Sequence, residues 1–191
     1  MDEIGAMRER VEILTFDGEW KTARKIWAQL TPEAKVTYSS NSKSLPGVRG
    51  AIRCKSGLTP ANLLRWRNEY YAPGDVLDEL EYTDFRAAKV ILTACVARKP
   101  KKQIGNIYNR PMPEEPETLS FPGILAEKYV RWTQDKPNVD LENTVVLVTP
   151  KAIVLGAGDL IDADGAGYSV QLCYLTDPHK NEYEIVRKED A

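Results

Sequence analysis

The chain has 191 residues, of which 42% are hydrophobic, and its 26 basic side chains nearly balance 28 acidic ones, for a formal net charge of -2. Such a chain is long and apolar enough for one or two packed domains, and its balanced charge excludes the chain-wide basic field that nucleic-acid-binding proteins usually carry. No run approaches the ~20 apolar residues of a transmembrane helix, and residues 1–6 lack the features of a signal peptide, so we expect a soluble protein that is made in the cytoplasm and has no membrane partner.

The N-terminal part of the chain predicts strands separated by turns. Val11 and Ile13 share one face of a period-two pattern, and Asp17-Gly18 supplies turn residues shortly after them. Residues 25–30 fit the spacing of both a strand and a helix. We interpret them as a strand, because Thr31-Pro32 ends the segment after a few residues.

A long loop is predicted over residues 31–50. This segment is polar and rich in serine up to Ser44, and Leu45-Pro46-Gly47 then punctuates it. Loops of this length inside a compact domain usually have a function or are disordered. A solvated loop without a role is the alternative explanation.

The region from residue 52 to residue 96 is predicted to form a further series of short strands. Residues 52–55 and 63–66 are strand candidates, and Arg67-Asn68 is a candidate tight turn, because asparagine adopts a positive φ at low cost. Residues 69–71 run back from this turn, and residues 89–96 form the clearest strand. Its apolar face is expected to consist of Val90, Leu92, Ala94 and Val96.

The first half therefore begins with an MRERV segment at residues 7–11 and a WAQL segment at residues 27–30. The long loop, an Ile-Arg pair at residues 52–53, a hairpin ending in Tyr70-Tyr71 and the last apolar strand follow in that order. This order resembles the head-tail joining proteins of tailed bacteriophages, also called head-closure or stopper proteins. Members of this family begin with a Met-Arg-x-Arg-Val-like strand. They continue through a Trp-Ala-x-Val/Leu strand, a long loop, an Ile-Arg strand, a hairpin ending in Tyr and a Leu-rich strand. The resemblance covers residues 7–98.

Prolines mark two further features. Pro73 departs from the family pattern. Because proline lacks the backbone N–H that a central strand needs, the strand after Tyr71 is expected to be an edge strand, to contain a bulge or to be short.

The segment 99–118 holds four prolines and changes from basic to acidic. It is predicted to be a linker, or an arm that drapes over a neighbouring subunit.

The second half repeats themes of the first. Residues 124–127 resemble residues 26–29, and residues 155–187 resemble residues 58–96 in the order of strands and turns. Tyr168, Val170, Leu172 and Tyr174 alternate with polar or small residues, as in a strand. We predict a mainly β protein of two small β-barrel-like units in tandem. Residues 1–98 form the first, with the long loop inserted in it, and residues 119–191 form the second after the Pro-rich linker.

No residue pattern indicates a catalytic, metal-binding or cofactor-binding site. His179 is the only histidine, which excludes metal sites built on two histidines of one chain, and it lies in a predicted turn. Cys54, Cys95 and Cys173 have no Cys-x-x-Cys spacing, and each fits a buried or half-buried thiol in a strand. A nucleophilic pair of Cys173 and His179 lacks a helix N-terminus that would lower the pKa of the thiol.

Three glycine-rich or acidic segments have a structural explanation. Gly156-Ala157-Gly158 lacks the third glycine and the helix of a nucleotide site. The segment 162–165, with sequence DADG, fits a hairpin turn better than a calcium loop. The carboxylates between residues 75 and 84 fit a solvated face, or the lining of a channel through which DNA slides. Acid/base chemistry by paired carboxylates is the alternative.

The resemblance implies a non-enzymatic structural protein of the virion, in the phage neck. It would form a homo-oligomeric ring, sixfold or twelvefold, between the portal and adaptor proteins of the DNA-filled head and the tail terminator or tail proteins. The ring would help to close the channel, which holds genomic DNA without sequence specificity. The loop residues expected to reach into the channel or onto the adjacent ring are Tyr38, Ser39, Asn41, Lys43, Leu45 and Arg49. The aromatic residues expected at subunit interfaces are Trp27, Trp66, Tyr70 and Tyr71.

Alternative functions stay open at this point. A tail terminator or another neck ring would have similar small barrels. A nucleic-acid-binding module of the OB type is the alternative from another class. It predicts one exposed face that contains Arg53, Lys55, Arg65, Trp66 and Arg67. An enzyme would need a buried pair of carboxylates in a cleft.

Overall fold

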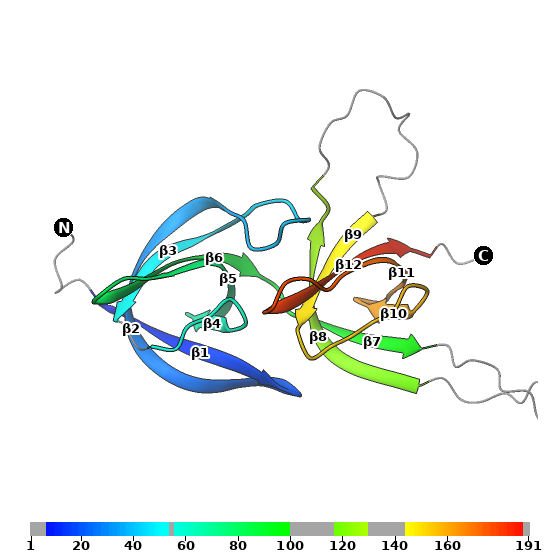
Figure 1. Ribbon diagram of the computed structural model, residues 1–191, viewed down its shortest axis with the longest axis horizontal. Coiled ribbons are helices and arrows are strands. Elements are labelled where there is room, and N and C mark those ends of the chain that lie inside the picture. Colours follow the sequence, from blue (N-terminus) through cyan, green and yellow to red (C-terminus); the bar gives the residue numbers. More distant parts are fainter. Residues whose placement is uncertain (1–6, 54–55, 100–116, 130–143, 189–191) are drawn as a thin grey trace, which may run out of the picture.

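The first half of the chain folds into a closed antiparallel β-barrel (Figure 1). The computed structural model describes residues 7–53, 56–99, 117–129 and 144–188, and every regular element in these ranges is a β-strand. Barrel 1 is closed by pairing of its first and fourth strands, so that its strands follow the order β1-β2-β3-β6-β5-β4. Its strands are β1 (Glu9–Asp17), β2 (Glu19–Val36), β3 (Leu45–Arg53), β4 (Leu63–Trp66), β5 (Glu69–Asp78) and β6 (Tyr82–Val90).

The second half folds into another closed antiparallel barrel with the same topology. Its order is β7-β8-β9-β12-β11-β10, which is the order of barrel 1 with six added to each number. The predicted tandem of two β-barrels is thereby confirmed. Barrel 2 consists of β7 (Thr93–Lys99), β8 (Glu117–Glu127), β9 (Thr144–Pro150), β10 (Leu160–Ala163), β11 (Ala166–Tyr174) and β12 (Lys180–Arg187).

Tight turns with positive φ connect the paired strands at the positions predicted from the sequence. Arg67 and Asn68 join β4 to β5 with φ values of 51° and 62°, and Asp164 and Gly165 join β10 to β11 with 51° and 73°. Two-residue hairpins of this kind match the twist of the strands they connect. Gly18, with φ 73°, likewise joins β1 to β2. The DADG segment is therefore a hairpin turn.

Pro73 lies at a β-bulge. The register of β5 against β6 shifts between Pro73 and Asp75, while β5 stays between β4 and β6, so the expectation of a bulge is confirmed. A Cβ atom on Gly74 would lie 2.1 Å from the carbonyl oxygen of Thr37. Only glycine therefore lets the chain that leaves β2 pass this close to the bulge.

Two boundaries differ from the sequence prediction. The predicted strand 89–96 is wrong, because β6 ends at Val90, Ile91-Leu92 connect the barrels, and β7 begins at Thr93. Because the chain changes barrels at these two residues, the inward-facing side chains of β7 are Cys95 and Ala97, which face the interior of barrel 2, and not the predicted Ala94 and Val96. The period-two pattern runs on through the two connecting residues, and this continuity hides the boundary. The strand pairing thus divides the barrels at residues 91–92 and not at residue 98.

The predicted loop 31–50 is also shorter in the structure. Residues 31–36 extend β2, residues 45–50 belong to β3, and residues 37–44 connect the two strands. Pro32 is tolerated because β1 pairs with β2 only as far as Ala28, which leaves an open edge beside Pro32. Gly47 allows β3 to approach β6, since a Cβ atom there would lie 2.1 Å from the carbonyl oxygen of Ala87.

The Pro-rich segment does not join the barrels. Residues 100–116 lie outside the described residues, but the strands that flank them, β7 and β8, pair with each other from Lys99 and Glu117 onward. The segment therefore connects two strands of barrel 2. Cys54 and Lys55 also lie outside the described residues. Cys95 is buried, and Cys173 is half-buried.

Each barrel has its own apolar interior, and a third apolar cluster lies between the barrels. The interior of barrel 1 includes Ile13, Ile52, Leu64, Tyr71 and Phe85. The interior of barrel 2 includes Leu147, Ile161, Val170, Tyr183 and Ile185. The inter-barrel cluster consists of Leu14, Val36, Tyr38, Leu63, Ala72, Ala88, Val90, Ile124, Ala126, Val146 and Val148.

Candidate functional site at the junction between the barrels

The two barrels pack through the outer faces of their strands. On barrel 1, small and apolar side chains such as Ala72 and Ala88 are buried although they point away from the barrel interior. On barrel 2, Val146 and Val148 of β9 are buried in the same cluster, with exposed fractions of 0% and 4%. Such outward positions are usually polar when a sheet faces water. Burial of this patch holds the two barrels together.

Residues 37–44, which we call the junction segment, bind barrel 2 through the backbone. The N–H of Lys43 donates to the carbonyl of Glu127 at 2.9 Å, and the N–H of Tyr129 donates to the carbonyl of Asn41 at 2.8 Å. Ser42, between these two residues, forms an isolated β-bridge with Lys128. The junction segment thus adds a short piece of β-structure to β8.

Charged side chains reinforce this contact. Asn41 Nδ2 donates to Glu182 at 2.8 Å, and Lys43 Nζ lies 2.5 Å from a carboxylate oxygen of Glu127. Lys180 Nζ donates to the carbonyl of Tyr38 and lies 5.7 Å from the centroid of the Tyr38 ring. Burial lowers the pKa of Lys180 below its ordinary value. These contacts link β8 and β12 of barrel 2 to the segment that leaves β2 of barrel 1.

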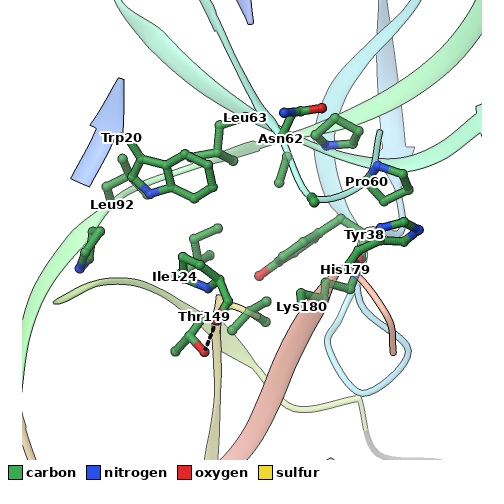
Figure 2. Close-up of a pocket in the computed structure, with 16 residues that line it drawn as sticks. Trp20, Tyr38, Pro60, Asn62, Leu63, Leu92, Ile124, Thr149, His179 and Lys180 are labelled. Atoms are coloured by element: carbon green, nitrogen blue, oxygen red, sulfur yellow. Dashed lines mark hydrogen bonds between the residues drawn. The ribbon is translucent and has the colours of Figure 1, made fainter. Parts of the chain in front are cut away.

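A small cavity lies between the barrels beside the junction segment (Figure 2). Its volume is ≈ 30 Å³, which is room for about two water molecules. Figure 2 shows the phenol of Tyr38 reaching into this space, with Trp20 on the opposite side. The Tyr38 hydroxyl and Trp20 Nε1 are buried without a hydrogen-bond partner in the described part of the chain. The wall also includes Pro60, Pro73, Pro122, Pro150, Leu92 and Ile124.

Burial also affects the acidity of the groups near the cavity. Tyr38 is only 2% exposed, and this burial raises the pKa of its phenol well above the ordinary value. The phenol therefore stays protonated and can donate a hydrogen bond into the cavity. The volume is well below the several hundred Å³ of typical small-molecule sites. The cavity suits ordered water, and the junction as a whole is a packing surface.

The predicted loop residues are mostly brought together here. Tyr38, Ser39, Asn41 and Lys43 belong to the junction segment, and Leu45 packs against the inter-barrel cluster. Arg49 is separate from them, since it lies exposed on β3. The junction segment leaves barrel 1 and contacts barrel 2 of the same chain. That the predicted loop residues reach into a channel or onto an adjacent ring stays a prediction.

The predicted interface aromatics fall into three environments. Tyr71 is in the interior of barrel 1, and its hydroxyl donates to Glu69 at 2.9 Å. Trp66 packs at 5.9 Å from the Tyr71 ring, and Tyr70 borders the inter-barrel cluster. Trp27 alone among the four keeps most of its side chain in solvent, with 58% exposed.

Arg65 of β4 and Lys25 of β2 are both paired with one carboxylate of β1. Arg65 Nε donates to Glu12 at 2.9 Å, and Lys25 Nζ lies 2.8 Å from the same carboxyl group. Lys25, followed by Arg65 and Thr22, holds the pKa of Glu12 down to about 2.

A second carboxylate, Glu9, binds Trp66 and Arg67. It accepts hydrogen bonds from Trp66 Nε1 at 2.8 Å and from Arg67 at 3.0 Å, while the Arg67 guanidinium lies 4.4 Å from the centroid of the Trp66 ring. Arg65 and Arg67 of the face proposed for nucleic acid therefore have their own counter-charges, whereas Arg53 of that face lies exposed at the end of β3. Lys55 of that face lies outside the described residues.

Sequence reasoning missed Trp20, Lys180 and Glu182 as junction residues. The available signal was the uninterrupted apolar run at residues 145–148 of β9. A strand that is apolar on both faces is covered on both faces. The run therefore indicated that the outer face of barrel 2 is covered, although not which side chains cover it.

The described residues hold no group of three or more His, Cys, Asp or Glu side chains arranged to bind a metal ion. Within the same ranges, no helix has the length and apolar character needed to cross a bilayer. Comparisons of the chain with protein-family models, with curated proteins and with solved structures returned no match.

Proposed function

We propose that this chain is a non-enzymatic structural protein of the tailed-phage neck, where it forms part of a ring between the portal complex of the filled head and the tail. The order of segments in residues 7–98 supports this proposal through its resemblance to head-tail joining proteins. The tandem of two barrels with one topology is consistent with it, since small β-barrels are the units that the resemblance implies.

The observation that carries the proposal is the way in which the barrels are joined. An apolar cluster fills the space between them, and the junction segment binds β8 and β12 across it. The buried apolar cluster outside the two barrel interiors thus holds two modules together. Two barrels fixed to each other in this way offer a rigid unit for a ring, which supports the proposal.

A tail terminator or another ring of the neck is the second candidate. Such a ring would also be built from small barrels that pack side by side. It would differ from a head-closure ring in the protein that it contacts. The nucleic-acid-binding module is less favoured, because Glu12 pairs with Arg65 of β4 and Glu9 pairs with Arg67 of the turn that follows β4. A phosphate backbone would have to displace these carboxylates before it could bind there.

The test is co-sedimentation of the full chain with portal complexes and, separately, with tail particles. We expect the chain to join one or both particles in an integral ring stoichiometry, as measured by light scattering and sedimentation. A head-closure protein joins the portal complex first, whereas a tail terminator joins the tail alone. Failure to join either particle, together with salt-dependent binding of single-stranded DNA, contradicts the proposal and favours the nucleic-acid-binding module.

A further inference from the structure

An exposed tryptophan lies between two arginines on the outer face of barrel 1. Arg10 of β1 is directly opposite Trp27 of β2, and Ala28 is opposite Ile52, which brings Arg53 of β3 beside Trp27 on its other side. Residues opposite each other in an antiparallel sheet share one face. Ile26, Ala28 and Ile52 pack in or against the core of barrel 1, so Arg10, Trp27 and Arg53 point outward. We call these three residues the Trp27 row.

The Trp27 row has the chemistry of an interface. Trp27 is 58% exposed, and both arginines are exposed. Neither guanidinium forms an ion pair with another residue of the described ranges, unlike Arg65 and Arg67. Tryptophan and arginine are enriched where proteins contact each other, because the large ring is buried there and the guanidinium binds carboxylates.

A complementary feature lies at the β5–β6 hairpin of the same barrel. Residues 77–81, which we call the acidic tip, carry three carboxylates, Asp78, Glu79 and Glu81, beside two leucines. Leu80 is fully exposed at 101% and Leu77 is 62% exposed. Figure 1 shows this hairpin at the end of barrel 1 that is remote from barrel 2, so the second barrel leaves it accessible.

We propose that the acidic tip of one copy docks on the Trp27 row of a second copy. In this contact Leu80 packs on the indole of Trp27, and the carboxylates that flank it face Arg10 and Arg53. The opposite charges of the acidic tip and the Trp27 row favour this pairing. The leucines of the tip give the exposed indole an apolar contact that it does not have in the single chain. A purely anionic partner would pair with the arginines but would leave Leu77 and Leu80 in water.

The two features lie side by side, because Tyr82 at the base of the acidic tip is paired with Arg53. A two-fold arrangement would use both features of both copies at once. A head-to-tail arrangement would use one feature of each copy and would continue until a ring closes. The docking itself is independent of the phage assignment, and only ring closure rests on the proposed function.

The experiment measures the mass of the full chain against concentration by sedimentation. A row variant, Arg10→Glu with Arg53→Glu, and a tip variant, Leu80→Ser with Glu81→Lys, are each expected to weaken self-association by about tenfold or more. Leu172→Ser is the matched control, because this leucine is 52% exposed on barrel 2 and lies outside both features. It is expected to leave the association unchanged.

Mixing the two variants supplies the decisive readout. The row variant keeps an intact tip and the tip variant keeps an intact row, so an equimolar mixture is expected to form a one-to-one pair that neither variant forms alone. A wild-type chain that stays monomeric, or variants that associate like wild type, would overturn the docking. Binding of single-stranded DNA that only the row variant loses would also overturn it. If the variants still join portal or tail particles, the proposed function stands apart from this result.

Discussion

Asn62 and Asp159 form equivalent hydrogen bonds in the two barrels. Asn62 Oδ1 accepts a hydrogen bond from the N–H of Thr59, and Asp159 Oδ2 accepts one from the N–H of Gly156, each at 2.8 Å. In both cases the residue's own N–H returns a bond to the carbonyl three positions earlier, at 3.0 Å and 3.1 Å. Each pair closes the turn that leads into the short fourth strand of its barrel. The two barrels therefore share a local motif as well as a topology.

The first prediction follows from a difference between these two residues. Asn62 Nδ2 also donates to the carbonyl of Leu14 at 3.3 Å, whereas Asp159 only accepts. Asp159→Asn is therefore expected to be nearly neutral, because it keeps the accepting oxygen. Asn62→Asp is expected to lower the free energy of unfolding by about 1–2 kcal/mol, because it turns a carboxylate oxygen toward the Leu14 carbonyl. Urea unfolding of both variants measures the difference, and equal effects would contradict it.

Local signals in the sequence were sufficient to predict the mainly β fold, several of its strands and turns, and the tandem arrangement. Period-two patterns and turn pairs such as Arg67-Asn68 depend on neighbouring residues alone, and they reappear in the structure. The barrel boundary was missed because Ile91-Leu92 continue an apolar pattern while the chain changes barrels. Strand pairing between distant residues decides which barrel a strand joins, and a local pattern carries no information about it.

The junction was only partly predictable for the same reason. The sequence identified Asn41 and Lys43 among six candidate loop residues, but their contacts with Glu182 and Glu127 join residues that are far apart in the chain. Each strand of a closed barrel has an inward and an outward face. The period-two pattern alone does not say which face an apolar side chain such as Ala88 is on. Small side chains at outward positions became informative only when the barrel order was known.

The second prediction concerns the inter-barrel cluster. Val148→Glu introduces a charge at a position that is 4% exposed between the barrels and outside both barrel interiors. Burial of an unpaired charge is costly, so we expect the barrels to separate while each stays folded. Calorimetry should then show two transitions in place of one. Val154→Glu is the matched control on barrel 2, because Val154 is 53% exposed, and it is expected to keep the wild-type profile.

The third prediction uses the unpartnered hydroxyl in the cavity. Tyr38→Phe removes a buried hydroxyl that has no hydrogen-bond partner in the described residues, and it keeps the ring that packs in the inter-barrel cluster. Its free energy of unfolding is expected to equal or slightly exceed that of wild type. Tyr38→Ala is expected to cost about 3–5 kcal/mol, because it empties the space of the ring. A large loss in Tyr38→Phe would mean that the hydroxyl binds an ordered water which stabilises the junction.

The last prediction is a dependence of stability on acid pH through Glu12. Its pKa is about 2 in the folded chain and 4.5 in the absence of its partners. Between these values the unfolded chain binds the proton more readily, so acid favours unfolding there. The stabilising contribution of Glu12 is thus fully present above pH 4.5 and is lost as the pH falls toward 2.

Solvent screens this ion pair, so we expect a contribution of about 1 kcal/mol. Glu12→Gln keeps the size of the side chain but removes the charge that Lys25 and Arg65 bind. Urea midpoints measured from pH 6 to pH 2 should fall more steeply for wild type than for this variant. The two curves should approach each other near pH 2, where about half of the wild-type carboxylate is protonated as well. Parallel curves over this range would show that the pair on the outer face of β1 and β4 contributes nothing to stability.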